Sequence, residues 1–329
     1  MTHLTHHEAH SHNADHYYKA AVIIPSRGGA HLLHYPLEAL RAQTEKDFQV
    51  IVVLDGDIDN SEAVLKKYAA EGGLNLSTII FPENRGRVAA LNAGHRAANA
   101  KVLIRCDDDL QPDEYYVANH LKYHTADDGE QGVIGIYLNQ FPTTPYSKVY
   151  GEYRDRLFRE AAYAADESTR WNYWAGNVSM SKKLFDDIGG YDPAYRLYGW
   201  EDVDMGYEIY RRGATIHIAP ELATKHYVAA TTTSVRALRA LHSGAARSIF
   251  VRKHGEQAHT APNPGGVWGA AVKTLALFTT ERTIKTVGDA SDRILLKLPV
   301  KLAEKIVALQ VEAASYAGVK YPRRAQKVF

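Results

Sequence analysis

The sequence has little cysteine and no long apolar run. Of its 329 residues one is cysteine, Cys106, so an intramolecular disulfide is excluded and a reducing compartment fits. We interpret Cys106 as a small apolar filler at a strand end, not as a nucleophile. No apolar run approaches the about 18 residues of a membrane span, and the N-terminus lacks the charged-then-apolar order of a secretory signal. We therefore expect a cytoplasmic protein, which could still contact the inner membrane face peripherally.

Two phosphate-binding motifs are also missing. No GxGxxG follows the first predicted strand, and no GxxxxGK[S/T] occurs in the chain. Such glycine-rich loops let backbone N–H groups approach a phosphate chain closely. Their absence argues against a dinucleotide-dependent dehydrogenase and against a phosphate-loop ATPase.

The net charge is only +1, but the charges are unevenly distributed. Residues 230–329 carry 16 Lys and Arg residues against 6 Asp and Glu residues, which leaves the preceding part acidic. A basic segment of this kind suits an anionic lipid surface, an anionic acceptor or the acidic part of a second copy, so peripheral membrane contact and a homodimer both stay open. It lacks the stacked aromatic platform typical of nucleic-acid binding, so we expect no nucleic-acid partner.

Three parts follow from composition and pattern. Residues 1–19 form a polar, histidine-rich leader that we expect to be disordered, because no metal-ligand spacing is evident. Residues 20–229 contain the main folded domain, in two halves at 20–113 and 132–229. Residues 230–329 form a basic helical C-terminal extension. The 45% hydrophobic content is sufficient for a real core.

Apolar strands alternate with amphipathic helices in the first part of the domain. The predicted strands are residues 20–25, 48–54, 76–81 and 102–106, and the predicted helices are residues 32–43, 61–71 and 88–98. This alternation predicts an α/β fold with a mostly parallel, Rossmann-like sheet and helices on both faces. Ligands of such sheets bind at the carboxyl ends of the strands. Here those ends carry Ser26-Arg27, Asp55-Gly56-Asp57 and Asp107-Asp108-Asp109.

The pattern changes after Gly132. The predicted strands are residues 132–139, 171–181 and 215–219, and the predicted helices are residues 149–165, 182–188, 201–212, 234–253, 267–279 and 289–318. We expect Pro299 to kink the last helix. Aromatic residues gather between Trp174 and Trp200, and rings placed in this way suit stacking on a sugar face.

Three successive carboxylates directly follow the apolar strand that ends at Cys106. Asp107, Asp108 and Asp109 repel one another, so the arrangement costs stability unless a cation that prefers oxygen ligands neutralises it. The pattern therefore indicates an Mn²⁺ or Mg²⁺ site, although a solvated acidic turn is the alternative.

Five motifs in order resemble a known family. They are Ala21 to Arg27, Val50 to Gly56, Asn84 to Gly94, Asp107 to Asp109, and Gly199 to Asp204. Together they resemble a GT-A fold glycosyltransferase of family 2, and Trp174 to Asn177 with Gly199 to Asp202 is similar to the galactosyltransferase-type acceptor half. The resemblance covers about residues 20–228. It implies a glycosyltransferase domain at residues 20–229, with a nucleotide-binding half at 20–113 and an acceptor half at 132–229.

The resemblance implies a role for each matched residue. Pro25, Ser26 and Arg27 would line the nucleotide pocket, with Asp55 on the uracil ring and Arg87 on the base or diphosphate. Asp107 would face the ribose and the metal, Asp108 is the variable middle residue on the nucleotide-sugar side, and Asp109 and His226 would bind the metal. Trp174, Gly176, Asn177 and Trp200 would contact the acceptor or sugar, Glu201 would position hydroxyl groups, and Asp202 would be the catalytic base.

The implied activity moves a hexose or N-acetylhexosamine from a UDP-sugar to an acceptor hydroxyl, with inversion. The acceptor stays open among a secondary metabolite, a wall polymer and a lipid-linked glycan. Each of these roles has a structural alternative. Arg87 could be a surface charge, His226 a packed residue, and Glu201 or Asp202 a helix cap. Alternatives for the whole chain are a sugar nucleotidyltransferase, or a catalytically weak scaffold protein with a glycosyltransferase-like core.

Overall fold

A computed structural model describes residues 6–9, 16–125, 129–196 and 198–326. The chain divides into two compact units, each described below by itself. The first unit contains the described residues up to 138, then 161–193 and 201–227, and the second contains 139–160, 194–200 and the residues from 228 onward. Two segments from inside the predicted domain of residues 20–229 therefore belong to the second unit, together with the helical extension.

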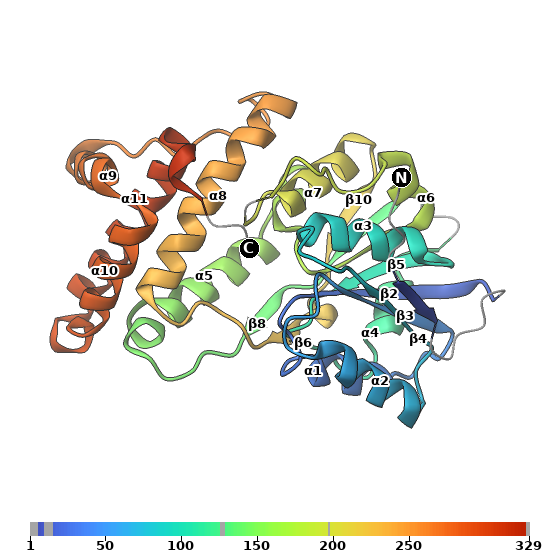
Figure 1. Cartoon of the computed structure of the whole chain (residues 1–329). Helices are drawn as coiled ribbons and strands as arrows, with labels where there is room; N and C mark the ends of the chain where they lie inside the picture. The colour runs from blue at the N-terminus through green and yellow to red at the C-terminus, as the bar shows by residue number, and fades with distance from the viewer. Residues whose placement is uncertain (1–5, 10–15, 126–128, 197, 327–329) are drawn as a thin grey trace. The chain divides into compact units, whose positions relative to one another are not determined.

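The first unit is built on a sheet of eight described strands in the order β1-β4-β3-β2-β5-β9-β7-β10 (Figure 1). The strands are β1 His6–Ala9, β2 Tyr18–Ser26, β3 Phe48–Leu54, β4 Leu76–Ile80, β5 Ala100–Cys106, β7 Gln131–Ile134, β9 Asn177–Ser181 and β10 Thr215–Ile218. Strands β4, β3, β2 and β5 run parallel to one another, and β10 runs parallel to β7. Strand β1 runs antiparallel to β4, and β9 runs antiparallel to both β5 and β7. The prediction of a mostly parallel sheet is confirmed.

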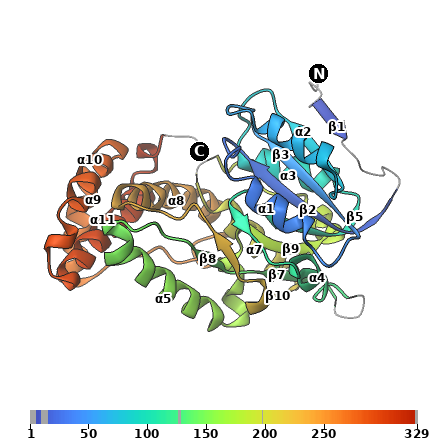
Figure 2. The same cartoon turned by 90° about the horizontal axis from the view of Figure 1, so that it is seen from below.

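Alternate residues of the central strands face opposite helical layers. Val22 and Val50 pack in one core with α1 His34–Arg41, α2 Ser61–Glu71 and α4 Tyr116–Leu121. On the other face α3 Arg87–Ala97 packs so closely that a Cβ on its Gly94 would lie 2.5 Å from Cγ2 of Ile23. Helix α6, Lys182–Ile188, covers β5 and β9. Helices α1 and α2 lie below the sheet in Figure 1 and toward the viewer in Figure 2.

A smaller sheet lies next to the acidic loop. Its strands are β6 Leu110–Gln111, β11 Thr224–His226 and β8 Tyr137–Asn139, in the order β6-β11-β8. The antiparallel register places His226 opposite Leu110, the residue after Asp109. Helix α7, Glu201–Arg211, and the short 3₁₀ helix Pro220–Leu222 precede β11 in the chain.

Local structure differs from prediction in three places of the first unit. The predicted strand 132–139 is two strands, because the chain leaves the large sheet at Gly135, whose N–H donates to the Asn177 carbonyl. In the predicted strand 171–181 only Asn177–Ser181 is extended, since Glu167–Tyr173 form a 3₁₀ helix. In the leader, His6–Ala9 form a strand on the edge of β4 where disorder was expected, and residues 1–5 and 10–15 lie outside the described residues.

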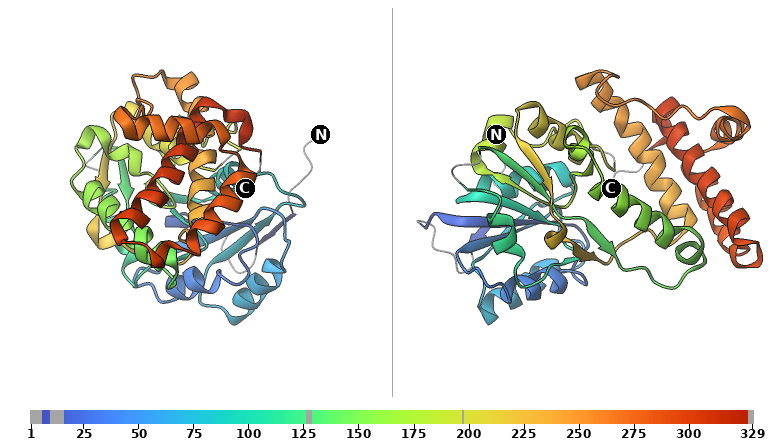
Figure 3. Two further views of the ribbon diagram at one scale, coloured as in Figure 1. Left: turned by 90° about the vertical axis from the view of Figure 1, so that its left-hand side faces the viewer. Right: turned by 180° about the vertical axis from the view of Figure 1, so that it is seen from behind.

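The second unit is helical. It contains the π-helix Ser147–Gly151, most of α5 Glu152–Tyr163, α8 Thr233–His254, α9 Gly266–Phe278, α10 Glu281–Asp292 and α11 Val300–Lys320. Helices α8 and α11 run side by side (Figure 3), with their backbones in contact at Gly244 and Gly318. None of the described helices has the length and hydropathy needed to cross a membrane.

The prediction of one kinked helix over residues 289–318 is wrong, because α10 ends at Asp292 and α11 begins at Val300. The Asp292 carboxylate accepts hydrogen bonds from the Thr233 N–H (3.0 Å) and the Thr233 hydroxyl (2.5 Å) at the start of α8. This tertiary contact coincides with the end of α10. Pro299 then caps the start of α11, the position where a missing N–H costs least.

Candidate active site

The three acidic residues after β5 have three different partners. The Ser26 hydroxyl donates to Oδ2 of Asp108 at 2.6 Å, and Nε2 of His226 lies 3.0 Å from Oδ2 of Asp109. The Asp107 N–H donates to the Gly176 carbonyl at 3.0 Å, and the Asp107 side chain bonds to Arg105. The Asp108 and Asp109 carboxylates thus reach the end of β2 and the β11 strand, and the Asp107 backbone contacts the residue before β9. This is the arrangement expected at the carboxyl edge of a parallel sheet.

Asp109 and His226 form a two-residue pair suited to a cation. The His226 ring stacks on the Tyr137 ring, with centroids 4.6 Å apart, which holds the imidazole toward Asp109. Oδ1 of Asp109 is buried and has no hydrogen-bond partner among the described residues. Buried carboxylate oxygens are normally satisfied, so this atom fits a missing positive ligand. No group of three His, Cys, Asp or Glu side chains able to hold a metal occurs in the described part of the chain.

Two protein ligands are nevertheless chemically sufficient for Mg²⁺ or Mn²⁺. Such cations are commonly held by one or two carboxylates together with substrate phosphates and water, not by a closed protein cage. The Asp109–His226 pair meets this requirement, so the residues present fit the predicted metal. The third predicted ligand, Asp107, is bonded through both carboxylate oxygens to Arg105.

Arg105 is a site residue that the sequence-based prediction missed. It lies on β5 and is 1% exposed. Its Nε donates to Oδ1 of Asp107 at 2.8 Å, its Nη2 donates to Oδ2 of Asp107 at 3.2 Å, and its Nη1 donates to Oδ1 of Asp202. The sequence did contain a signal for Arg105, because it is an arginine inside an otherwise apolar strand. A buried guanidinium requires anionic partners, so such an arginine indicates carboxylates nearby.

The candidate base lies at the start of α7, next to a buried glutamate. Glu201 is 3% exposed; its Oε1 lies 3.5 Å from Nη1 of Arg87, and its Oε2 has no hydrogen-bond partner among the described residues. Negative side chains in the first turn of a helix are favoured by the helix dipole. The two predicted catalytic carboxylates are therefore both present at one helix end, and each contacts an arginine.

Burial and neighbouring charges raise the pKa of some carboxyl groups in the site and lower that of others. Burial together with the Asp202 charge raises the pKa of Glu201 to about 7, and burial also raises the pKa of Asp202. Burial by itself would also raise the pKa of Asp107, but the positive charges of Arg105 and Arg87 outweigh this effect and lower that pKa. Burial raises the pKa of Asp108 to about 7. Asp107 is thus the most firmly ionised carboxylate of this group.

The residues predicted for nucleotide binding lie at the ends of β2, β3 and β4. Nη1 of Arg27 donates to the Asp55 carbonyl at 2.5 Å. The Asp55 carboxylate accepts the Arg85 N–H at 2.6 Å and the Gly86 N–H at 2.9 Å. Pro25 and Ser26 end β2, and Arg87 begins α3. The loops after three neighbouring strands are therefore tied together, with Asp55 at their centre.

The residues predicted for the acceptor or sugar differ in accessibility. Trp174 is 2% exposed and Asn177 is fully buried, where the Asn177 amide donates to the Leu222 carbonyl at 2.8 Å. Gly176 lies against the site, since a Cβ there would overlap Oδ2 of Asp107 and Oη of Tyr137. In this structure Trp174 and Asn177 support the site from inside the core, and Gly176 lies directly against it.

Trp200 belongs to the second unit, directly before Glu201 in the chain. Its backbone φ is 71°, a left-handed conformation that is a genuine outlier for a bulky residue. Within that unit its Nε1 donates to the Ser243 hydroxyl of α8 at 3.1 Å, and its ring packs on Phe250. These contacts hold the Trp200 side chain within the second unit.

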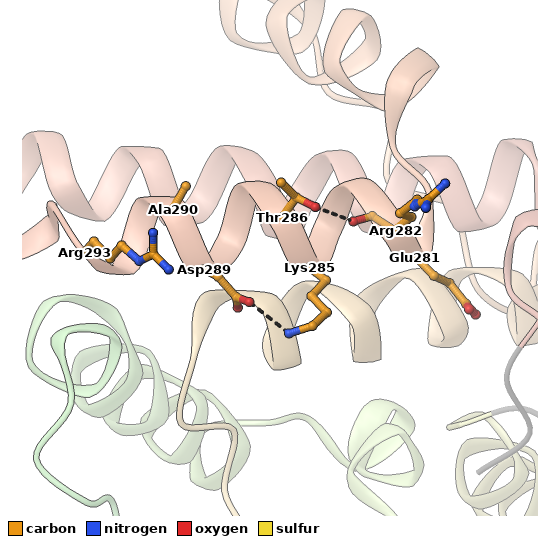
Figure 4. A pocket seen from close by; sticks show the side chains of 7 residues that line it. All are labelled: Glu281, Arg282, Lys285, Thr286, Asp289, Ala290 and Arg293. Carbon is orange, nitrogen blue, oxygen red and sulfur yellow. Dashed lines mark hydrogen bonds and ion pairs between the residues drawn. The ribbon is translucent and has the colours of Figure 1, made fainter.

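A cavity of about 730 Å³ lies along α10 in the second unit (Figure 4). Its described lining includes both signs of charge, and Lys285 is paired with Asp289 at 2.9 Å. None of the residues predicted for catalysis or nucleotide binding lines it.

Comparisons with known proteins identify glycosyltransferases as relatives of this chain. The pattern of "Glycosyl transferase family 2" matches residues 21–189, and that of "N-terminal domain of galactosyltransferase" matches residues 155–232. A validoxylamine A glucosyltransferase of Streptomyces hygroscopicus subsp. jinggangensis is 28% identical over 228 residues, covering 61% of this chain and 53% of the relative. A chondroitin synthase of Pasteurella multocida is 23% identical over 229 residues, covering 60% of this chain and 23% of the relative. The chain thus spans about half, or less, of these relatives.

Solved structures share the fold. The mannosyltransferase PcManGT from Pyrobaculum calidifontis, in complex with GDP-Man and Mn²⁺, has a TM-score of 0.62 at 19% identity, covering 94% of this chain and 89% of that one. The S. aureus protein TarS (residues 1–349), in complex with UDP-GlcNAc, has a TM-score of 0.51 at 14% identity, covering 91% and 92%. The predicted GT-A fold is confirmed, and the chain belongs to glycosyl transferase family 2.

Proposed function

We propose that this glycosyltransferase moves a hexose or N-acetylhexosamine from a UDP-sugar to an acceptor hydroxyl, with inversion at the anomeric carbon. The observation that carries the proposal is the Arg105 bridge, which brings Asp202 at the start of α7 to Asp107 after β5. A candidate base and the acidic loop thus lie at one edge of one sheet, as transfer from a nucleotide to a hydroxyl requires.

Asp109 and His226 are the residues that would hold Mn²⁺ or Mg²⁺. When bound, such a cation neutralises the negative charge that develops on a leaving diphosphate. The support from this chain is the buried, unpartnered Oδ1 of Asp109 and the His226 ring fixed by Tyr137. PcManGT, which has a similar fold, was solved with Mn²⁺.

Ser26, Arg27, Asp55 and Arg87 would bind the nucleotide part of the donor. The Asp55 oxygens already accept two backbone N–H groups, and each retains a lone pair that can accept the imide N–H of uracil. Arg87 begins α3, where its charge and the helix N-terminus both attract a diphosphate. TarS, solved with UDP-GlcNAc, supports a UDP-sugar, whereas PcManGT, solved with GDP-Man, makes GDP-sugars the necessary comparison.

Asp202 would take the proton of the acceptor hydroxyl as it attacks the anomeric carbon. Inversion requires the base on the side opposite the leaving group, and a carboxylate at a helix start is kept available as an anion by the helix dipole and by Arg105. Glu201 and Trp200, its neighbours in the chain, would position the hydroxyl groups of acceptor and sugar. The names of relatives support either a small metabolite or a polysaccharide chain as acceptor.

The second unit offers a surface for a membrane or a second copy. From the end of α10 into the first turn of α11, four exposed apolar residues alternate in the sequence with basic ones: Ile294 46%, Leu296 59%, Val300 67% and Leu302 48%, with Arg293, Lys297 and Lys301. We propose that this segment mediates the peripheral contact or homodimer suggested by the basic composition. Sedimentation with anionic vesicles and light scattering at low salt distinguish the two.

The decisive experiment measures nucleoside diphosphate release from UDP-, GDP- and dTDP-sugars, with Mn²⁺ present or chelated. Metal-dependent release from a UDP-sugar supports the proposal and identifies the donor. Pyrophosphate formation from a sugar phosphate and UTP would instead support a nucleotidyltransferase. Absence of both turnover and UDP binding would leave the scaffold alternative.

A further inference from the structure

Arg105 carries a positive charge at a position where charge is costly. It is 1% exposed, on a strand whose neighbouring side chains are apolar. Burying a guanidinium is compensated only when its donors are satisfied by anionic partners in good geometry. Here three of its five N–H donors bond to two carboxylates, so the whole group functions as a bridge between Asp107 and Asp202.

The bridge joins residues that are 97 positions apart in the chain. Nε and Nη2 take the two oxygens of Asp107, which leaves Nη1 directed at Oδ1 of Asp202. The planar fork of arginine can address two carboxylates in fixed directions, whereas a lysine ammonium is a point charge without this geometry.

Asp107 is itself held in place from the other side. Its N–H donates to the Gly176 carbonyl at 3.0 Å, and Gly176 lacks the Cβ that would overlap Oδ2 of Asp107. The Gly176 N–H in turn donates to Oη of Tyr137 at 2.7 Å. The start of β9 therefore fixes Asp107, and Asp107 fixes the plane of the guanidinium.

We infer that Arg105 is a positioning residue for the proposed base Asp202, and that Asp107 serves as its counter-ion and support instead of as a metal ligand. The inference rests on the proposed function and deepens it. Metal binding then falls to Asp109 and His226, while Asp107, Arg105 and Asp202 orient the base.

The electrostatic surroundings agree with this assignment. Burial raises the pKa of Asp202, and the adjacent Arg105 charge opposes that effect, so the bridge favours the ionised form of the base and also aligns it. The other titratable or charged groups that interact with this cluster are Arg87, Glu201, Tyr191, Tyr137, His95 and His226. The Arg87 charge acts on Asp202 in the same direction as that of Arg105.

The test compares Arg105→Lys, Arg105→Gln and Asp107→Asn with the wild-type protein in the donor and acceptor reaction. We expect kcat to fall by about 10²-fold or more in Arg105→Gln, by less in Arg105→Lys, and the acidic limb of the kcat–pH profile to move to higher pH. Affinity for UDP with Mn²⁺, measured by calorimetry, should stay within about threefold of wild type in all three. Arg170→Gln is the matched control, because Arg170 bonds only backbone carbonyls and exposed Glu167 among the contacts described.

Specific results would overturn the inference. Unchanged kcat in Arg105→Gln and Asp107→Asn excludes a positioning role. If Asp107→Asn loses both Mn²⁺ and UDP binding, Asp107 is a metal ligand and not only a counter-ion of Arg105. If Arg105→Gln does not fold, the nearly isosteric Asp107→Asn decides by the same criteria. If the wild-type protein turns over no nucleotide sugar, the proposed function itself is wrong. This result differs from an active wild-type protein with unaffected variants, which would contradict only the role of Arg105.

Discussion

Nε2 of His226 lies 3.0 Å from Oδ2 of Asp109, although His226 ends strand β11 and Asp109 lies in the turn before β6, far away in the sequence. We predict that His226→Ala and Asp109→Asn each weaken Mn²⁺-dependent UDP binding by at least about tenfold, because each removes one of two proposed ligands. Calorimetry with UDP, with and without Mn²⁺, measures the effect. His217→Gln on β10 is the control, and equal binding in all variants would exclude this pair as the metal site.

Asp202→Asn should abolish most turnover and leave the donor bound. Loss of a general base costs about 10²–10⁴-fold in rate, or roughly 3–5 kcal/mol of transition-state stabilisation. Single-turnover kinetics and UDP titration on the same preparation separate the two quantities. Glu208→Gln on the same helix should keep wild-type kcat, since Glu208 pairs with Arg212 outside the site. Unchanged turnover in Asp202→Asn would remove Asp202 from the role of base.

Glu201→Gln should make stability less dependent on pH. The folded-state pKa of Glu201 is raised from its ordinary 4.5 to about 7, so between these values the folded protein retains a proton that the unfolded chain has released. Stability from this group is present at low pH and is lost as pH rises through that window, by at most about 1.4 kcal/mol per pH unit. In urea unfolding from pH 5 to 8, the free energy of unfolding of the variant should increase relative to that of the wild type as pH rises. A constant difference would contradict the assignment.

Gly318→Ala should destabilise the second unit. A Cβ at this position would overlap the Leu241 carbonyl, so α11 could no longer approach α8 as closely. Overpacking of this kind costs typically about 1–3 kcal/mol. Gly265→Ala is the matched control, because a Cβ there meets no heavy atom within 4 Å and its φ of −105° suits alanine. Thermal unfolding of both variants measures the difference, and equal midpoints would mean that α8 and α11 can move apart freely.

Elements with a strong local pattern were predictable from the sequence. Phe48–Leu54, Ser61–Glu71 and Lys182–Ile188 form with the predicted bounds, since apolar runs, helical spacing and glycine stops all act within a few residues. Elements that depend on distant contacts were not predictable. The break between α10 and α11 coincides with the bond from Asp292 to Thr233, 59 residues away, which no local window contains.

The candidate site shows the same division. The acidic triplet and Asp202 were identified from motifs, and the structure connects Asp107 to Asp202. Arg105 was missed because its meaning depends on a carboxylate 97 residues further along the chain. Trp174 was predicted to face a sugar, but its burial follows from the 3₁₀ helix before it, which short-range periodicity did not reveal. The metal, nucleotide and base assignments stay predictions.

The reversed direction of β9 has a consequence for the order of folding. Strands β2, β3 and β4 can pair through connections of ordinary length, but β9 reaches β5 only by closing a loop of about 70 residues, from Cys106 to Asn177. Loop closure of this kind raises the entropic barrier and slows pairing. The nucleotide-binding strands should therefore gain amide protection in pulse-labelled hydrogen exchange before β9 does. A nascent chain would then complete its catalytic edge only after synthesis has passed β9, α7 and His226 on β11.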